Sequence, residues 1–123
     1  MGYTNVLAWG MLTGKYLDIP PVDDIDEERA KENFKNPRGR MDTKGWGGTL
    51  YRYRSEAARN AIKEYNEIAR KNGMTLTELS LRWARQRNLI TTSLVGHSSV
   101  KQLDETLQAF KETASCKKCF VRY

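Results

Sequence analysis

The chain has 123 residues, which suffices for one small domain but not for an enzyme core of roughly 250 residues or for two domains. Its 39% hydrophobic and 29% charged residues are typical of a globular protein rather than a disordered one, and no apolar run approaches the roughly 18–20 residues that cross a bilayer. The formal charge of +6 comes from basic residues interleaved with acids along the whole length, which favours a solvated surface over a nucleic-acid-binding face.

The N-terminal part of the chain is predicted to be mostly loop. Residues 3–16 begin as a short extended piece and pass into a glycine-containing loop at 9–15 (WGMLTGK). Residues 17–50 are polar, with two prolines near the start and a Gly-Trp-Gly-Gly run near the end, which indicates an excursion over the surface. The acidic stretch 23–36 within this segment is compatible with one short helix.

Residues 55–72 form the clearest predicted helix. Ser55 can cap its start, and Gly73 supplies the left-handed residue with which such helices end. Thr75 opens a second helix and completes a capping box with Glu78. The expected buried stripe of the first helix consists of Ala58, Ala61, Ile62, Tyr65, Ile68 and Ala69, and that of the second consists of Leu76, Leu79, Ser80, Trp83 and Ala84.

The last predicted elements are a strand and a helix. Residues 89–95 are apolar and partly β-branched, and they predict a fully buried strand. A final helix begins at Ser98 or Ser99, and its expected inner face carries Leu103, Leu107 and Phe110. This order of elements is typical of an α/β protein with parallel strands. Two parallel strands cannot form a sheet covered on both faces, so the pattern predicts a piece of something larger.

The loop after the second predicted strand is a candidate anion site, because the free N–H groups and dipole of a helix start favour negative charge. Gly96 lets a ligand approach the backbone, Ser98 and Ser99 offer hydroxyls, and Lys101 offers charge. Simple capping of the helix is the alternative explanation of the same serines.

Two cysteines, Cys116 and Cys119, lie close together near the C-terminus. Zinc requires four ligands, and neither a second cysteine pair nor a nearby histidine is present, since the single His97 is distant in sequence. We therefore expect incidental thiols and no metal site. The first residues lack a basic region followed by an apolar core, so we expect no signal peptide and a cytoplasmic protein without a membrane partner.

Several segments, in their order and spacing, resemble the C-terminal part of aldo-keto reductases, in the branch of bacterial and plant NADP-dependent reductases and potassium-channel β subunits. They are 12–16 (LTGKY), 52–53 (RY), 69–76 (ARKNGMTL), 79–83 (LSLRW), and 92–96 (TSLVG) followed by Ser98, Gln102, Leu103 and Glu105. The resemblance runs from about Gly2 to Phe110. It implies an α/β fold, the C-terminal fragment of a (β/α)8 TIM barrel from about strand 7 to helix 8. We expect a partial oxidoreductase domain at 1–112 and an unrelated tail at 113–123.

The resemblance also implies roles for particular residues in binding NADP. The family's loop after strand seven wraps the pyrophosphate, an arginine in the following loop contacts the adenosine end, and the start of helix eight holds the 2′-phosphate and adenine. The pyrophosphate loop corresponds to Leu7, Ala8, Gly10 and Lys15. The arginine corresponds to Arg40, with Arg38 as second choice, and the start of helix eight corresponds to Gly96, Ser98, Gln102 and Glu105. Thr106 stands where the family often has asparagine, and His97 is interpreted as a loop residue.

The family's catalytic aspartate, tyrosine, lysine and histidine come from the first half of the barrel, and none has a counterpart here. Lys15, Tyr16 and His97 are the right residue types at other places, so we expect no catalytic residue. The sequence thus predicts a fragment of an NADP(H)-dependent reductase of small carbonyls, inactive by itself. A non-catalytic dinucleotide- or partner-binding module is the alternative, and a nucleic-acid-binding protein has only the net charge in its favour. We expect the isolated chain to be partly folded or to aggregate, because strand edges and apolar helix faces lack cover.

Overall fold

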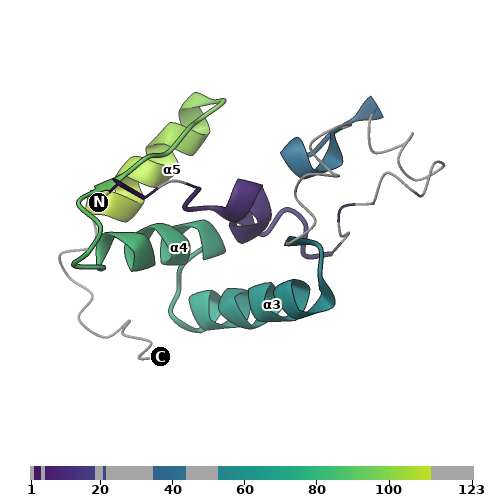
Figure 1. Cartoon of the computed structure of the whole chain (residues 1–123), viewed down its shortest axis with the longest axis horizontal. Helices are drawn as coiled ribbons and strands as arrows, with labels where there is room; N and C mark the ends of the chain where they lie inside the picture. The colour runs from purple at the N-terminus through teal and green to yellow at the C-terminus, as the bar shows by residue number, and fades with distance from the viewer. Residues whose placement is uncertain (1, 4, 19–20, 22–34, 44–52, 112–123) are drawn as a thin grey trace.

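The computed structural model describes residues 2–3, 5–18, 21, 35–43 and 53–111 (Figure 1). The elements in chain order are strand β1 (Gly2–Tyr3), 3-10 helices η1 (Ala8–Thr13) and η2 (Arg40–Asp42), helices α3 (Glu56–Lys71) and α4 (Leu76–Arg85), strand β2 (Thr92–Ser93) and helix α5 (Val100–Lys111). The short helix expected at 23–36, both cysteines and the tail at 113–123 lie outside the described residues, apart from Lys35 and Asn36.

Both middle helices begin, and the first of them ends, as the sequence predicts. The Ser55 hydroxyl accepts a hydrogen bond from the Ala58 amide at 3.2 Å, and the Thr75 hydroxyl accepts one from the Glu78 amide at 3.1 Å. Gly73 follows α3 with φ of 69°, the left-handed conformation that glycine adopts without a steric penalty. Local capping chemistry therefore defines α3 and α4.

The buried face of α4 differs from the predicted one. Leu76 and Ala84 are buried as expected, but Leu81 is fully buried and Trp83 is exposed, with the Arg87 guanidinium 4.1 Å from its ring centroid. The reason is that α4 packs against α3, η1 and α5, which rotates its buried side toward Leu81. In the described part of the chain, no element covers the face on which Trp83 lies.

The two strands pair in parallel, as predicted, with Gly2 opposite Thr92 and Tyr3 opposite Ser93. The predicted length and burial of the second strand are wrong. Its ladder includes only 92–93, while Leu89, Leu94 and Val95 are exposed. A strand is buried only when further strands or helices cover it, and the described residues supply one neighbouring strand at one edge.

Helix α5 starts with the predicted cap, since the Ser99 hydroxyl accepts from the Gln102 amide at 3.3 Å. Two of the three residues predicted for its inner face are wrong: Leu103 and Leu107 are exposed, and the helix buries Thr106 and Ala109 instead. The third, Phe110, is partly buried against the core as predicted. This follows from docking on α4, where Ala109 joins Val6, Leu81 and Ala84 in one core cluster.

A second core cluster, composed of Met11, Tyr16, Met41, Ile62 and Leu76, joins η1, η2, α3 and α4. Figure 1 shows η1 at the centre, between α4 and α5 on one side and η2 on the other. The loop around η1 thus contacts both cores, which fixes the segment on which the candidate site is built. None of the helices in the described part of the chain has the length and apolarity that a membrane crossing requires.

Candidate functional site

The loop around η1 has an unusual backbone. Ala8, Trp9 and Gly10 are consecutive and all lie in the left-handed region, with φ of 46°, 56° and 94°. Non-glycine residues adopt this region rarely, and such strain gathers at functional sites. Asn5 holds the conformation: its side chain accepts from the Trp9 amide at 2.8 Å and donates to the Tyr53 hydroxyl at 2.8 Å.

The amides of this loop are already engaged. Those of Ala8 and Gly10 donate to the carbonyls of Asn5 and Leu7, each at 2.9 Å, and the Trp9 amide donates to the Asn5 side chain. An anion that approaches the loop would therefore meet mainly the cationic side chains around it rather than a row of free N–H groups.

The Lys15 side chain runs closely past the backbone of two glycines. A Cβ on Gly10 would lie 2.8 Å from the Lys15 Cε, and a Cβ on Gly39 would lie 2.9 Å from the same carbon and 2.6 Å from the Tyr16 hydroxyl. Only glycine fits both positions without moving Lys15. Sequence reasoning missed Gly39; its place between two arginines, Arg38 and Arg40, is the signal that could have drawn attention to it.

Arg38 is held rigidly beside Tyr16. Its Nε and Nη2 donate to the two oxygens of Asp42 at 2.7 and 3.0 Å, and its own amide donates to the same carboxylate at 3.1 Å. Asp42 is 2% exposed, so this bidentate pair is partly shielded from water. The guanidinium lies 4.9 Å from the Tyr16 ring centroid, and the Tyr16 hydroxyl accepts from the Met41 amide at 3.3 Å.

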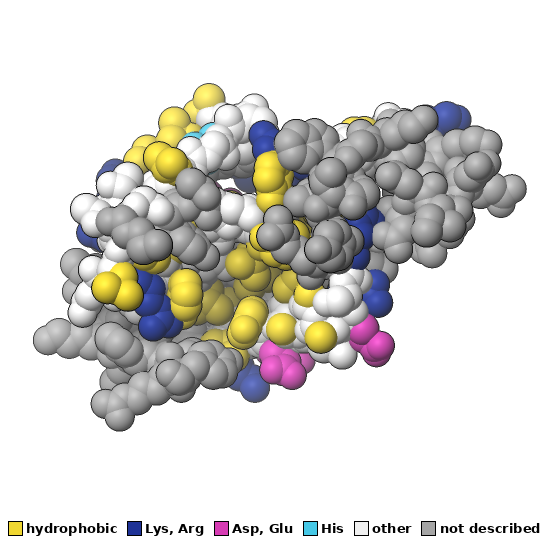
Figure 2. Space-filling view, viewed as in Figure 1, with side chains coloured by type: hydrophobic (Ala, Val, Ile, Leu, Met, Phe, Trp, Pro, Cys, Tyr) yellow, Lys and Arg dark blue, Asp and Glu magenta, His cyan; other side chains and the backbone are white. Residues whose placement is uncertain are grey.

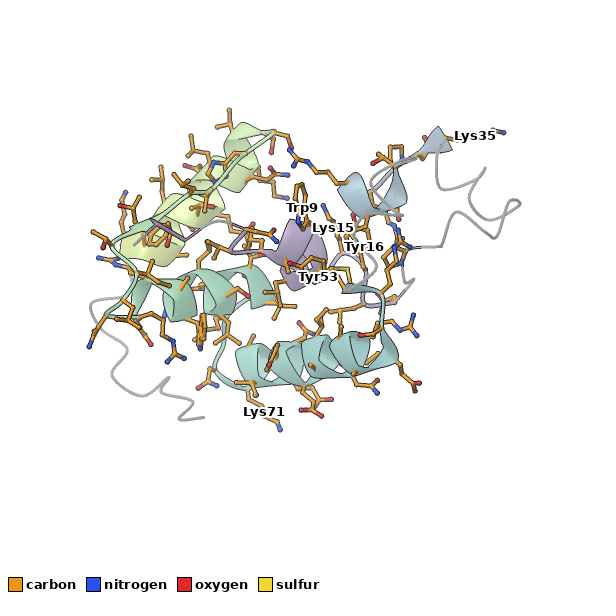
Figure 3. The ribbon with its side chains drawn as sticks, in the orientation of Figure 1. Trp9, Lys15, Tyr16, Lys35, Tyr53 and Lys71 are labelled. Carbon is orange, nitrogen blue, oxygen red and sulfur yellow. The ribbon has the colours of Figure 1, made fainter. Side chains whose placement is uncertain are left out.

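Lys15, Arg38 and Arg40 together form a group that we call the basic cluster. The Arg40 guanidinium lies 5.0 Å from the Trp9 ring centroid, and the Lys15 ammonium lies 5.3 Å from that of Tyr16. Figure 3 shows Trp9, Lys15 and Tyr16 next to one another at η1. The structure thus brings Arg40 from the distant second loop to Trp9, which lies between the predicted residues Ala8 and Gly10 in the chain.

Burial and charge shift three pKa values in the basic cluster and beside it. Desolvation lowers the pKa of Lys15, opposed by attraction to Asp42. Burial raises the pKa of the Tyr16 hydroxyl, and the hydrogen bonds to Asp42 raise the pKa of Arg38. A second anionic group beside Lys15 would offset the desolvation of its ammonium.

The other four predicted residues lie at the start of α5. The amide and hydroxyl of Ser98 both donate to the Gln102 side-chain oxygen, at 2.9 and 3.1 Å, and Glu105 accepts from the Thr75 hydroxyl at 3.2 Å. Gly96 has open space on its side-chain side. Within the described residues, these four form no hydrogen bond or ion pair with the loop around η1 or with Arg40, so the predicted residues fall into two groups. His97 contacts Thr106 at 2.9 Å.

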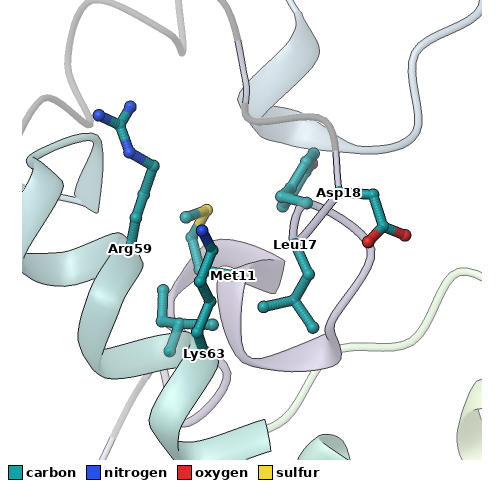
Figure 4. A pocket seen from close by; sticks show the side chains of 7 residues that line it. Met11, Leu17, Asp18, Arg59 and Lys63 are labelled. Carbon is teal, nitrogen blue, oxygen red and sulfur yellow. The ribbon is translucent and has the colours of Figure 1, made fainter.

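A cavity of about 140 Å³ lies between η1 and α3 (Figure 4). It is lined by Met11, Tyr16, Leu17, Asp18, Arg59, Ile62 and Lys63. None of the nine predicted residues lines it, and its volume is below the roughly 300 Å³ at which small-molecule sites begin. The cavity therefore does not mark a dinucleotide site, and both predicted groups lie outside it.

The chain matches known proteins over most of its length. A sequence model described as "Aldo/keto reductase family" matches residues 2–119. L-glyceraldehyde 3-phosphate reductase of Escherichia coli (strain K12) is 31% identical over 104 residues, which are 84% of this chain and 26% of that protein. Protein tas of the same strain is 27% identical over 85% of this chain, which corresponds to 25% of its own length. An aldo-keto reductase of Babesia bovis is 30% identical over 82% of this chain, which corresponds to 30% of that protein.

This chain corresponds to about a quarter (26%) of the length of the E. coli L-glyceraldehyde 3-phosphate reductase. The family implies a (β/α)8 barrel, oxidoreductase chemistry and a nicotinamide cofactor, and the parallel pairing of β1 and β2 agrees with such a barrel. By the match over residues 2–119, the chain belongs to the aldo/keto reductase family.

Proposed function

We propose that this chain is the NADP(H)-binding part of a carbonyl reductase and corresponds to about strand 7 to helix 8 of a (β/α)8 barrel. The domain is proposed to cover residues 1–112. Two parallel strands, with the α-helices α3 and α4 between them and α5 after them, support this assignment. The active sites of such barrels lie in the loops that follow the strands, which here are the loop around η1 and the loop before α5.

The observation that carries the proposal is the basic cluster. Three cations from two separate segments converge on one loop, and the carboxylate of Asp42 beside them is bonded to Arg38. NADP(H) carries a pyrophosphate and a 2′-phosphate, and fixed cations suit these groups because they need little reordering on binding. We assign the pyrophosphate to Lys15 and the loop 7–10, and the adenosine end to Arg40.

The start of α5 is proposed to hold the rest of the adenosine end. Gly96 and Ser98 precede α5 and Gln102 lies in its first turn, where the helix dipole favours a phosphate, and Glu105 lies one turn further along. Ser98 donates two hydrogen bonds to the Gln102 side-chain oxygen. Binding would exchange the Ser98 hydroxyl's contact with Gln102 for a contact with phosphate, while the amide can keep its own.

The residues present fit a nicotinamide cofactor, which would supply the hydride for reduction of a small carbonyl. The chain's own contribution is to bind and orient that cofactor. Tyr16 is proposed to have no part in proton transfer, because its hydroxyl is held in the core by the Met41 amide and its pKa is raised by burial. We propose that the proton donor belongs to the remainder of the barrel and that this chain alone is inactive.

Titration of the purified chain with NADPH, followed by tryptophan fluorescence, tests the proposal, because Trp9 lies beside Arg40. Arg40→Ala and Lys15→Ala should each weaken binding about tenfold or more, the effect of losing a charged hydrogen bond. Lys71→Ala is the matched control, since it removes the same charge from the exposed end of α3, away from η1 (Figure 3). Binding that all three variants weaken equally, or no binding by a folded chain, would refute the assignment.

A non-catalytic module that binds a dinucleotide or a protein partner is the second candidate. It is supported by the expectation, drawn from the resemblance, that residues 1–123 contain no counterparts to the family's catalytic residues. The two candidates differ in one measurement. Addition of the remaining barrel should give NADPH-dependent reduction of a carbonyl under the first proposal and none under the second.

A further inference from the structure

Glu105 of α5 is bonded to the residue that caps α4. The Thr75 hydroxyl donates to the carboxylate oxygen Oε1 of Glu105 at 3.2 Å, although the two residues are 30 positions apart in the chain. Glu105 is half-buried, whereas the four residues before it, 101–104, are exposed. The next residue, Thr106, is 4% exposed and shares a side of α5 with Ala109, which packs against α4. The carboxylate therefore lies at the edge of the contact between the two helices.

The Thr75 hydroxyl forms its two bonds with different parts of the group. Its oxygen accepts from the Glu78 amide at 3.1 Å, which caps α4, and its single proton is donated to Glu105. The two bonds do not compete, because one uses a lone pair of the oxygen and the other uses the proton. The cap also fixes the hydroxyl at the start of a helix, which is a rigid support. Thr75 thus holds one carboxylate oxygen of Glu105 in a defined position.

The charged groups near this bond do not take the place of Thr75. Glu78, the acidic residue of α4, is paired with Arg82. In the described part of the chain, no ion pair joins Glu105 to Lys101, which lies one turn earlier on α5. On the face of the molecule that Figure 2 shows, the acidic side chains lie over α3 at the lower edge and not over α5. Glu105 therefore has a neutral donor on Oε1, and its oxygen Oε2 can accept a hydrogen bond from a ligand.

The chemistry of a carboxylate indicates which part of the adenosine end it meets. A carboxylate accepts from a donor and repels a phosphate. The ribose carries the 2′-phosphate, so both belong with the first turn of α5, to which the phosphate is assigned. The adenine base extends beyond the ribose, and its exocyclic amine is a donor. Glu105, about one turn further along α5, is therefore assigned to this amine.

From these contacts we propose that Thr75 is a positioning residue, which orients the Glu105 carboxylate to accept a hydrogen bond from the adenine amine. Thr75 acts through Glu105 and does not itself contact the cofactor. The inference rests on the proposed function and adds the residue that prepares its adenine end. An acceptor that is ordered in advance loses less freedom on binding, so the bond discriminates more strongly between adenine and a base without the amine.

The test compares the affinity of the full chain for NADPH with its affinity for the hypoxanthine analogue of NADPH, in which a carbonyl oxygen replaces the amine and the charge is the same. The wild type should prefer NADPH about tenfold or more, the effect of a hydrogen bond to a charged group. Thr75→Asp retains a capping oxygen but has no proton to donate, so most of this preference should be lost, as in Glu105→Ala. The added charge acts on both ligands alike and cancels in the ratio. Thr75→Ser, the matched control, keeps the capping oxygen and the proton and should retain the wild-type preference.

The controls separate this inference from the proposed function. Thr75→Asp should match the wild type in urea denaturation, because the cap of α4 is retained, and it should not change the preference further when Glu105 is already alanine. NADPH binding with a preference that Thr75→Asp leaves unchanged would overturn this inference and leave the proposed function standing. A preference that Thr75→Ser also loses would do the same. Failure of the folded wild type to bind NADPH would refute the proposed function, and this inference with it.

Discussion

Replacement of Gly10 by alanine tests whether the position of Lys15 matters for binding. Gly10 has φ of 94°, and a Cβ there would lie 2.8 Å from the Lys15 Cε and 3.0 Å from its Nζ. The backbone is held by the loop's own hydrogen bonds, so the flexible end of Lys15 is the part that moves. Gly73 has φ of 69° and nothing within 4 Å of its Cβ position, so Gly73→Ala causes backbone strain of the same kind without such a clash.

The two variants should therefore match in stability and differ in binding. A left-handed alanine costs about 1–2 kcal/mol, and the lower entropy of the unfolded chain returns about 0.4–1 kcal/mol, so each should lose about 1 kcal/mol. Displacement of Lys15 would remove its proposed charged contact with NADP(H), about 1.5–3 kcal/mol, which is roughly 10- to 100-fold in the Kd for NADPH. This loss applies to Gly10→Ala and not to Gly73→Ala.

The assay pairs urea denaturation, followed by circular dichroism, with NADPH titration of each variant. We expect the urea midpoints of the two variants to fall by similar amounts, and only Gly10→Ala to bind NADPH more weakly. Equal NADPH affinity in the two variants would show that the position of Lys15 is irrelevant and would refute the reasoning. A much larger loss of stability in Gly10→Ala would show that the clash is absorbed by the fold rather than by Lys15.

Three further changes test the packing around the site. Asp42→Asn should lower the free energy of unfolding by urea by about 1–3 kcal/mol, because it removes the carboxylate charge to which Arg38 is bonded. Partial exposure of Arg38 to water limits the loss. Tyr16→Phe should change how stability depends on pH in the alkaline range. Burial raises the pKa of Tyr16 in the folded state above 10.0, so the stability that its neutral hydroxyl contributes is intact below about that pH and is lost as the pH rises through the pKa of the folded state. The free energy of unfolding of the variant should therefore fall less at alkaline pH than that of the wild type. At lower pH Tyr16→Phe should cost about 1 kcal/mol through the lost bond from the Met41 amide, and an unchanged alkaline limb would contradict the shift. Ser99→Ala should cost about 1 kcal/mol in thermal or urea melts through the lost cap of α5, and a cost near zero would show that the cap is not stabilising.

Features set by neighbouring residues could be predicted from the sequence. Ser55, Thr75 and Ser99 cap their helices, and Gly73 ends one, because each bond joins residues at most four apart. Parallel pairing was also predictable, since the helices between the strands return the chain in the same direction. The order of short segments such as 12–16 identified the family, which the match over 2–119 confirms.

Only the tertiary structure decided which apolar residues are covered and which cations meet. The sequence pattern shows that Leu103, Leu107 and residues 89–95 can be buried, but burial requires a neighbour. In the described chain β1 pairs with 92–93, whereas Leu89, Leu94, Val95, Leu103 and Leu107 remain exposed. Likewise, no local pattern places Gly39 beside Lys15 or Arg40 beside Trp9, because these contacts depend on how η2 packs against η1 across the intervening loop. The sequence by itself determined caps, strand direction and family, which depend on short-range bonds and segment order. Burial and the basic cluster depend on contacts between segments far apart in the chain.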